Sequence, residues 1–430
     1  MSFKHRRLAA TVSALALTLA VASCGGNTTG SGGGSDTLTF LVATSNPGQL
    51  KILNDIAAAY PQTNTKIKSV KVQTLGASDE RTLLLTELAT RTAPDVVWAG
   101  AGLATEFMDN GLLADLKPTL RKDSGYDFAD LEPNLLKAWS RGDKLYGIPF
   151  SSSTEGVYYN ADMFAKAGVP TPTQMISNGT WTWENFRAAL KTVAQKNKVS
   201  GFYIPGFDTF DNPTAAFPLW YAYGASPWST DGTQCGYTDP KMVAAMQLIH
   251  DMAYVDHSYP VKGQTADFAS GSSAATLAYI STAGNLVDAK FKWDFVPTPA
   301  GPAGARPGMG QSGWVVFKNS QNVDAAADFV KFLTNKTNSA KMAAFFPPDR
   351  ASLLTGASLK QANPYLTEQQ LDNVVVKGAT TATVEPVQKN SNAIFAALKP
   401  IMDGFWQPQA NVAAVMQKAC TAMQPLLTAK

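Results

Sequence analysis

The sequence predicts an α/β protein made of two doubly wound lobes joined by extended hinge strands. Its 430 residues are enough for two or three domains, each with a core of its own. From residue 37 onward, apolar strand-like runs alternate with helical patterns, which is typical of a parallel sheet covered by helices. An extended apolar stretch at 145–159 is interrupted by hydroxyl residues, as expected where the backbone leaves one core and enters another.

The first lobe begins with the apolar strand 37–43, a helix at 49–60 that stops before Pro61, and a second strand at 66–75. A third strand at 93–100 has a tryptophan near its exit. Ligands of open α/β sheets gather beyond the carboxyl ends of strands, so polar and aromatic residues there are site candidates. These candidates are Ser45, Asn46 and Asp79, and Trp98 is the tryptophan at the exit of the third strand. Helix capping by Asn46 and core packing by Trp98 are alternatives that the sequence leaves open.

The segment 145–168 reads LYGIPFSSSTEGVYYNADMFAKAG. Two strand-like runs flank four hydroxyl residues and Glu155, and the helix after them ends at Gly168. The polar part is expected to face water or a ligand where the two cores meet, which makes Ser152, Ser153 and Glu155 candidates.

The second lobe is expected to contain a helix at 186–193, a strand at 201–204 and a long helix at 238–254. An aromatic-rich region between them includes Trp220, Tyr221, Tyr223 and Trp228. At helical spacing some of these rings must belong to the core, whereas others could contact a ligand.

The N-terminus has the pattern of an export signal. Three basic residues precede the apolar run 8–22, which is followed by Val-Ala-Ser-Cys-Gly. The small residues before Cys24 resemble a bacterial lipobox, which implies cleavage before Cys24, lipidation of its thiol and a Gly/Ser-rich tether at 24–36. The alternative is an ordinary signal peptide with a chance cysteine.

The charge and the cysteine and histidine content indicate which partners and bonds the mature chain can have. The net charge of +3 includes the three basic residues of the leader, so 36 − 3 = 33 basic residues balance 33 acidic ones in the mature chain. Nothing therefore favours nucleic acid as a partner. Cys235 and Cys420 remain after the leader, and a disulfide between them is favoured over two buried thiols. His250 and His257 could share a helix face, but nothing else supports a metal site, and none is expected.

Several spaced motifs resemble one family. They are the Tyr-Gly-Ile-Pro to Ala-Gly pattern of 146–168, the Thr-Trp-Thr-Trp-Glu-Asn-Phe run at 180–186, the Ala-Pro-Asp-Val strand at 93–96 and the Gly-Leu-Leu-Ala-Asp-Leu segment at 111–116. Together they resemble the extracellular solute-binding proteins of ABC importers, family 1, the large sugar-binding type. The resemblance implies a class II periplasmic binding protein-like fold. It implies a leader at 1–23, an N-terminal lobe of 37–150 plus 305–345, and a C-terminal lobe of 151–304 plus 346–430.

The resemblance also implies further site residues. In the family the Ala-Pro-Asp-Val strand ends at the ligand cleft, which would bring Trp98 to a ligand, and Tyr221 and Tyr223 correspond to a wall of the family's sugar site. In the family, the strand and turn at 274–286 would bring Tyr279, Ser281 and Asn285 to the cleft; Asn285 stands where the family often has a tryptophan. The serine/threonine pair at 281–282 resembles the glycerophosphodiester-binding relatives, so the ligand class stays open. The return strand contributes Gly310, Gln311 and Trp314. Arg350 offers a planar cation suited to diols or phosphate, with an exposed salt bridge as the alternative.

The resulting expectation is a monomeric, lipid-anchored protein on the outer face of the membrane. It would bind an oligosaccharide without any cofactor and deliver it to transmembrane permease subunits. A glycerol phosphate or glycerophosphodiester ligand is the main alternative. A secreted glycosidase would need paired carboxylates, and although Glu155, Asp208 and Asp211 are available, none lies in a hydrolase motif. We therefore expect a binding protein and not an enzyme.

Overall fold

The computed structural model describes residues 35–75, 80–210, 213–264, 266–343, 345–384, 388 and 390–428. Apart from residues 1–34, the chain forms one compact unit. The predicted leader, the lipidation of Cys24 and the candidate Asp79 lie outside the described residues. In the part that is described, no helix combines the length and the apolar character needed to cross a membrane.

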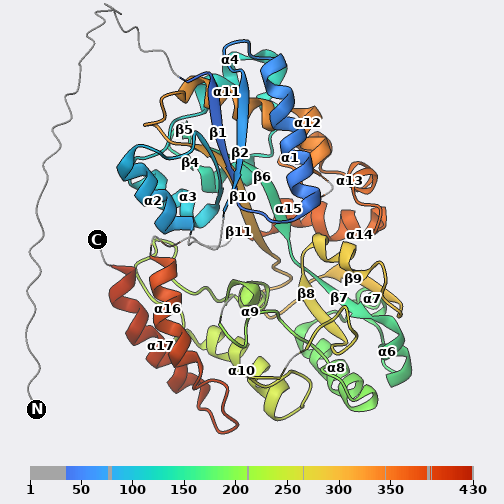
Figure 1. Ribbon diagram of the computed structural model, residues 1–430. Coiled ribbons are helices and arrows are strands. Elements are labelled where there is room, and N and C mark those ends of the chain that lie inside the picture. Colours follow the sequence, from blue (N-terminus) through green and yellow to red (C-terminus); the bar gives the residue numbers. More distant parts are fainter. Residues whose placement is uncertain are drawn as a thin grey trace, which may run out of the picture. The chain divides into compact units, whose positions relative to one another are not determined.

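The first lobe is built on a six-stranded sheet with the order β11-β10-β3-β1-β2, to which β6 adds by pairing with β10 (Figure 1). Strand β1 pairs in parallel with both β2 and β3, whereas β10 is antiparallel to β3 and β6. The first-lobe elements are β1 (Thr37–Val42), α1 (Pro47–Ala59), β2 (Ser69–Thr74), α2 (Glu80–Thr90), β3 (Val96–Gly100), α3 (Ala101–Asp109), α4 (Lys117–Lys122), α5 (Pro133–Leu136), β4 (Ser140–Arg141), β5 (Lys144–Leu145), β6 (Gly147–Thr154), β10 (Gly308–Val316), α11 (Val323–Leu333), α12 (Lys336–Met342) and β11 (Thr383–Val384).

The core of this sheet follows from its apolar runs. Phe40 on β1 faces Val96 on β3 in parallel register, and both are fully buried. Phe40 also packs edge-on against Phe329 of α11, with ring centroids 5.3 Å apart. A strand buried on both faces needs a nearly continuous apolar sequence, and this explains why β1 and β3 could be predicted from the sequence.

The second lobe has a three-stranded sheet with the order β8-β7-β9. Its elements are β7 (Gly156–Asn160), α6 (Ala161–Ala167), α7 (Pro172–Ser177), α8 (Trp183–Asn197), α9 (Phe217–Tyr223), α10 (Pro240–Tyr254), β8 (Ala275–Ala278), β9 (Trp293–Pro297), α16 (Ser391–Met402) and α17 (Val412–Leu427). Helices α13 (Gly356–Ala362), α14 (Glu368–Leu371) and α15 (Lys377–Thr381) follow the first lobe's α12 along the chain.

The second sheet differs from the doubly wound arrangement expected of both lobes. Strand β7 pairs antiparallel with β8 and with β9. The segment 201–204, expected as a strand, contributes an isolated parallel bridge between Tyr203 and Thr276. The reason lies in the connectivity, because β7 runs away from the first lobe as it enters the second, while β9 runs back towards it.

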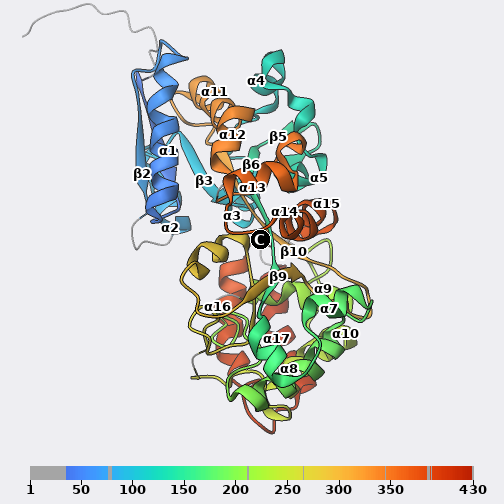
Figure 2. The ribbon, with the colours of Figure 1, turned by 90° about the vertical axis from the view of Figure 1, so that its right-hand side faces the viewer.

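Two large hydrophobic cores share no residue. One contains Phe40, Val96 and Trp314, and the other contains Val157, Trp183 and Met246. A smaller cluster joins Tyr158 and other residues around the second sheet to residues 359–375. Among the described residues, two stretches of chain pass between the lobes: β6 into β7, and the segment from β9 to β10 (Figures 1 and 2). The sequence assigned 346–430 to the C-terminal lobe, whereas β11 belongs to the first-lobe sheet. The other lobe boundaries stay a prediction.

Candidate functional site

The carboxyl edge of the first sheet presents the residues that follow β1. Ser45 and Asn46 are both exposed there. Asn46 caps α1, because its side-chain oxygen accepts hydrogen bonds from the backbone N–H groups of Gly48 and Gln49 at 2.9 and 3.1 Å. The capping role is therefore present, and any ligand contact by Asn46 would be additional to it.

Trp98 lies near the end of β3 and is half-buried. Its ring packs edge-on against Phe150 and Phe346, with centroids 4.8 and 5.3 Å away. Packing of this kind holds the indole in one orientation while part of the ring stays accessible. Trp98 therefore packs against the first core, and ligand contact by its accessible part stays a prediction.

A pocket opens at the same edge, between the end of β3 and the start of α16, and encloses about 410 Å³. We call it the strand-end pocket. Its lining combines first-lobe and second-lobe residues: Glu80, Arg81, Gly100, Gly102, Leu103, Glu106, Gln388, Asn390, Ser391 and Ala393. Its volume falls within the range of about 300–1,000 Å³ that is usual for small-molecule sites.

An ion pair forms one wall of this pocket. Arg81 binds Glu106 through two parallel hydrogen bonds, Nε to Oε2 at 2.7 Å and Nη2 to Oε1 at 2.6 Å. The Glu106 side chain is 7% exposed and that of Arg81 is 41% exposed, so the guanidinium edge remains accessible. Two-point pairing fixes the plane of the guanidinium. A Cβ built on Gly100 would meet no atom within 4 Å, so the opposite side offers room beside the backbone.

The second lobe supplies planar amides and a hydroxyl to the strand-end pocket. Gln388, Asn390 and Ser391 lie at the start of α16. Amides and a fixed guanidinium can exchange hydrogen bonds with several neutral hydroxyl groups at once, and this is the chemistry that a polyol needs. None of these residues was predicted from the sequence. The nearest predicted candidate, Asp79, directly precedes Glu80.

Strands β6 and β10, which we call the crossing strands, lead from one lobe towards the other. Their two faces carry side chains with different surroundings. Gln311 donates hydrogen bonds through Nε2 to the Leu135 carbonyl at 3.0 Å and to Ser152 Oγ at 3.1 Å, and both side chains are buried on the α5 side. Because side chains alternate along a strand, Ser153 points the opposite way. Ser153 is half-buried and lies opposite Gly310. Ser153 and Gly310 therefore stay in the proposed site, whereas Ser152 and Gln311 hold the crossing strands to α5.

Glu155 lies at the first crossing, between β6 and β7, and is 4% exposed. Its backbone N–H donates to the Gly308 carbonyl at 3.4 Å. A Cβ on Gly308 would stand 3.4 Å from Glu155 Oε2. Glu155 thus joins the outgoing and the returning crossings at the point about which the lobes would rotate.

Tyr279, Ser281 and Asn285 lie at the end of β8 and in the short 3-10 helix Ile280–Leu286 that follows. Ser281 and Asn285 are exposed, and Tyr279 is half-buried. The carbonyl of Tyr279 accepts a hydrogen bond from the hydroxyl of the buried Tyr158 at 3.2 Å, which fixes the start of this helix. These three residues remain candidates on the second lobe.

Two tryptophans expected at the site belong to the cores instead. Trp314 is completely buried and stacks on Phe150 with centroids 3.8 Å apart. Trp220 is 1% exposed and packs edge-on against Tyr237 at 5.8 Å. Both were wrongly placed at a ligand, because an aromatic-rich sequence does not distinguish core rings from exposed ones.

Arg350 is a further correction. It is fully buried, and its guanidinium donates to the carbonyls of Thr334, Asp127 and Tyr126 at 2.8, 3.2 and 2.9 Å. It also pairs with Asp130 at 3.3 Å. Neither the ligand role nor the exposed salt bridge considered from the sequence describes this residue. Arg350 is an internal brace of the first lobe.

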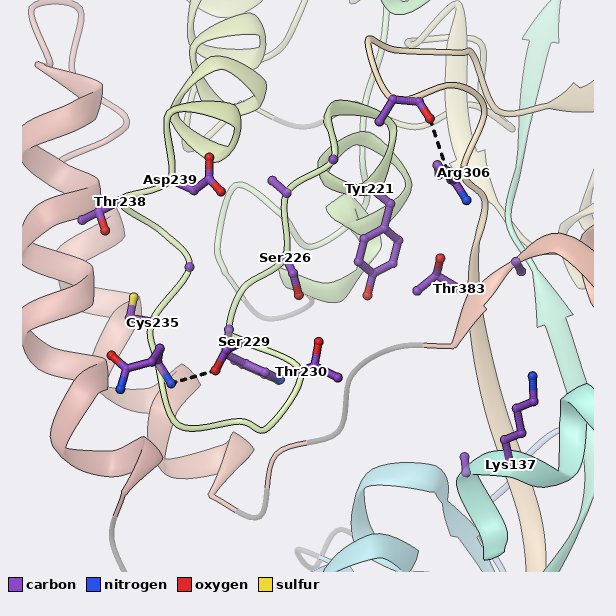
Figure 3. Close-up of a pocket in the computed structure, with 18 of the residues that line it drawn as sticks. Lys137, Tyr221, Ser226, Ser229, Thr230, Cys235, Thr238, Asp239, Arg306 and Thr383 are labelled. Atoms are coloured by element: carbon purple, nitrogen blue, oxygen red, sulfur yellow. Dashed lines mark hydrogen bonds between the residues drawn. The ribbon is translucent and has the colours of Figure 1, made fainter.

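A second and larger pocket of about 1,300 Å³ lies on the α5 side of the crossing strands (Figure 3). We call it the α5-side pocket. Two predicted residues line it, Tyr221 and Trp228. The side chains of Tyr221, Ser226 and Thr230 converge on its interior in Figure 3. Tyr223 is directed elsewhere, because its hydroxyl donates to Glu184 at 2.9 Å. Burial, followed by this hydrogen bond, raises the pKa of the Tyr223 phenol.

Cys235 and Cys420 form a disulfide, with their Cα atoms 5.5 Å apart. Cys235 lies on the wall of the α5-side pocket, and Cys420 belongs to α17. Within the described residues, no group of three or more His, Cys, Asp or Glu side chains is arranged to hold a metal ion. His250 instead contacts the Gln407 carbonyl through Nε2 at 3.0 Å.

Comparison with curated sequences finds relatives among binding proteins. Binding proteins of Brucella abortus and Brucella suis are 26% identical over 274 residues, which cover 60% of this chain and 62% of theirs. The alignment thus spans less than two thirds of the length of these relatives. An arabinooligosaccharide-binding protein of Bacillus subtilis is 25% identical over 369 residues, which cover 81% of each chain.

Solved structures share the fold over nearly the whole chain. An ABC substrate-binding protein of Listeria monocytogenes, in complex with cycloalternan, is 25% identical with a TM-score of 0.76, and the match covers 92% of this chain and 99% of that one. UgpB of Mycobacterium tuberculosis, in complex with glycerophosphocholine, is 19% identical with a TM-score of 0.75 and has the same coverage. The family model of bacterial extracellular solute-binding proteins matches residues 43–340, more than half of the chain. The chain belongs to the family of bacterial extracellular solute-binding proteins.

Proposed function

We propose that this protein captures a carbohydrate of oligosaccharide size between its lobes and delivers it to the permease of an ABC importer. The observation that carries the proposal is the strand-end pocket. It lies at the carboxyl edge of the first sheet, and both lobes line it with groups suited to hydroxyls. The relative from Bacillus subtilis that is named for arabinooligosaccharides, and the Listeria protein in complex with cycloalternan, support this class of ligand.

The proposed site joins the pocket to its neighbours on both lobes. Trp98 would offer a flat face to a sugar ring, while Arg81 and Gln388 would bind hydroxyl groups. The remaining proposed residues are Ser45, Asn46, Ser153, Tyr279, Ser281, Asn285 and Gly310. Asp79 stays a candidate from the sequence alone.

The arrangement supports a closing mechanism. The two main cores are separate, and extended stretches of chain join them, so the lobes can rotate about these crossings without unpacking either core. A solute that contacts both lobes binds the closed arrangement better than the open one and therefore shifts the population towards it. The closed form would be the one that docks on the permease.

We also propose attachment to the outer face of the membrane through a lipid on Cys24, because the sequence before it has the lipobox pattern. A lipid-anchored receptor stays near its permease without crossing the bilayer. Mass spectrometry of the membrane fraction tests this: a diacylated N-terminal Cys24 is expected, and a free thiol on a secreted chain would contradict it.

Calorimetric titration with arabino-oligosaccharides, maltotetraose, glycerophosphocholine and sn-glycerol 3-phosphate tests the ligand class. We expect saturable binding of at least one oligosaccharide. Trp98→Ala should weaken it about three- to tenfold, the usual worth of an aromatic contact. Ile176→Ala, a change at an exposed position on α7, serves as the control and should leave binding unchanged.

A phosphodiester ligand is the second candidate, favoured by the structural likeness to UgpB. The Ser281 and Thr282 pair is the sequence feature that supports it. Binding of glycerophosphocholine without binding of any oligosaccharide would move the conclusion to this class. Saturable oligosaccharide binding with no response to either phosphate compound would exclude it.

A further inference from the structure

Residues 228–235 form a tightly bonded turn at the edge of the second lobe, which we call the 228–235 turn. Trp228 and Cys235 face each other in an antiparallel bridge that closes it. Inside it, the backbone N–H of Ser229 donates to the Gln234 carbonyl at 2.9 Å. Asp231 Oδ1 accepts from the hydroxyl of Ser229 at 2.6 Å. These bonds hold the residues of the turn in one arrangement.

Helix α17 anchors this turn at two points. The first is the disulfide between Cys235 and Cys420, which closes a sequence separation of 185 residues. The second is Gln424, whose Oε1 accepts from the backbone N–H of Cys235 at 3.0 Å and whose Nε2 donates to the Thr233 carbonyl at 2.6 Å. The position of the turn is therefore set by the C-terminal helix.

The tip of the turn reaches the strand-end pocket through one side chain. Gln388, which lines that pocket, donates through Nε2 to the Gly232 carbonyl at 2.5 Å. Gly232 has a φ of +72°, and a Cβ there would stand only 2.8 Å from Gln388 Nε2. Only glycine adopts this backbone conformation readily while leaving room for the amide.

We propose that the disulfide-anchored 228–235 turn positions Gln388 for solute recognition, so that the integrity of the Cys235–Cys420 bond sets the affinity of the strand-end pocket. This inference rests on the proposed function of that pocket. Neither cysteine lines the strand-end pocket, so the coupling runs from Cys420 through Cys235 and Gly232 to Gln388. Gln388 is thus a specificity residue, and Gly232 and the disulfide act as positioning groups.

Substitution of Gly232 gives the sharpest test. Gly232→Ala places a methyl group against Gln388, whereas Gly179→Ala has the same backbone cost, with φ +70°, and would meet no atom within 4 Å. We expect Gly232→Ala to weaken oligosaccharide binding about three- to tenfold, the worth of one misplaced hydrogen bond, and Gly179→Ala to leave it unchanged. Adding Gly232→Ala to Gln388→Ala should cause no further loss, because both act on one contact.

Reduction tests the role of the disulfide. A dithiol such as dithiothreitol converts the bond into two cysteine thiols and is itself oxidised to a cyclic disulfide. Relative to the oxidised wild type, the reduced wild type should lose about as much affinity as Gly232→Ala does. Reduction of Gln388→Ala should cause no loss of affinity relative to oxidised Gln388→Ala. The double variant Cys235→Ala with Cys420→Ala repeats this without a reductant, and circular dichroism confirms that each sample is folded.

A readout without solute separates this inference from the proposed function. Amide hydrogen exchange at Ser391, whose N–H donates to the Gln388 carbonyl at 3.0 Å, should accelerate in Gly232→Ala and in the reduced protein. Faster exchange in a protein that binds no oligosaccharide would contradict the proposed oligosaccharide binding. It would still support the positioning of Gln388 by the 228–235 turn. Unchanged exchange and unchanged affinity in both samples would overturn the positioning role.

Discussion

Arg350 offers the clearest way to separate a structural cation from a ligand-binding one. Its fully buried guanidinium donates to three backbone carbonyls and pairs with Asp130, and it lies over the ring of Tyr126 at 4.6 Å. Replacement by methionine keeps the unbranched apolar stem, is shorter than arginine and removes every donor. The three carbonyls and the Asp130 carboxylate would then lose their partner inside the first lobe.

The loss of these hydrogen bonds determines how far the free energy of unfolding should fall. Removing one partner of a buried ion pair costs about 3–5 kcal/mol in the free energy of unfolding, because the groups left behind cannot recover their hydration. For a lobe of this size that corresponds to a fall in melting temperature of about 6–20 °C. Arg350→Lys keeps the charge but not the planar fork, so an intermediate loss is expected.

Denaturant titration of the wild type and Arg350→Met measures the change, and calorimetric titration of the folded protein measures solute affinity. Arg141→Met is the matched control, because Arg141 forms an exposed ion pair with Asp109 at 3.1 Å and its loss should cost about 1 kcal/mol or less. Affinity should stay within about twofold in both variants. An Arg350→Met protein of normal stability that no longer binds solute would refute the structural role.

Two further outcomes follow from buried carboxyl groups. Burial raises the pKa of the Asp349 carboxyl to about 7, although the charge of Arg350 acts in the opposite direction. The protonated carboxyl therefore stabilises the folded protein fully below about pH 3.8, and this stabilisation is lost as the pH rises through 7. Asp349→Asn should flatten this part of the curve of unfolding free energy against pH and be more stable than the wild type at pH 8; an unaltered curve would contradict the shift. Glu106→Gln loosens the guanidinium of Arg81, so calorimetry should show a solute affinity about three- to tenfold lower with a melting temperature within a few degrees of the wild type. Equal binding in that variant would remove Arg81 from the proposed site.

The sequence was informative wherever a local pattern determines structure. The apolar runs of β1 and β3, and the hydroxyl run at the first crossing, predicted a sheet, its carboxyl edge and a passage between two cores. The antiparallel pairing of β7 with β8 and β9 was missed, because direction depends on where each strand enters the lobe. Local composition does not contain that information.

The residues of the candidate site were predicted only in part, for the same reason. Arg81 and Gln388 line one pocket although 307 positions separate them, and no local signal marks either residue. Conversely, Trp314 and Arg350 have side-chain types suited to a sugar, but the fold buries both in the first lobe. Neighbours in space, rather than residue type, decide whether an aromatic ring or a cation can reach a ligand.

Small-angle X-ray scattering with and without a bound oligosaccharide tests the central claim most directly. If the solute binds between lobes that rotate about the crossing strands, the radius of gyration should fall on saturation in the wild type. Saturating binding, shown by calorimetry on the same sample, with an unchanged radius of gyration would contradict closure of the lobes around the solute.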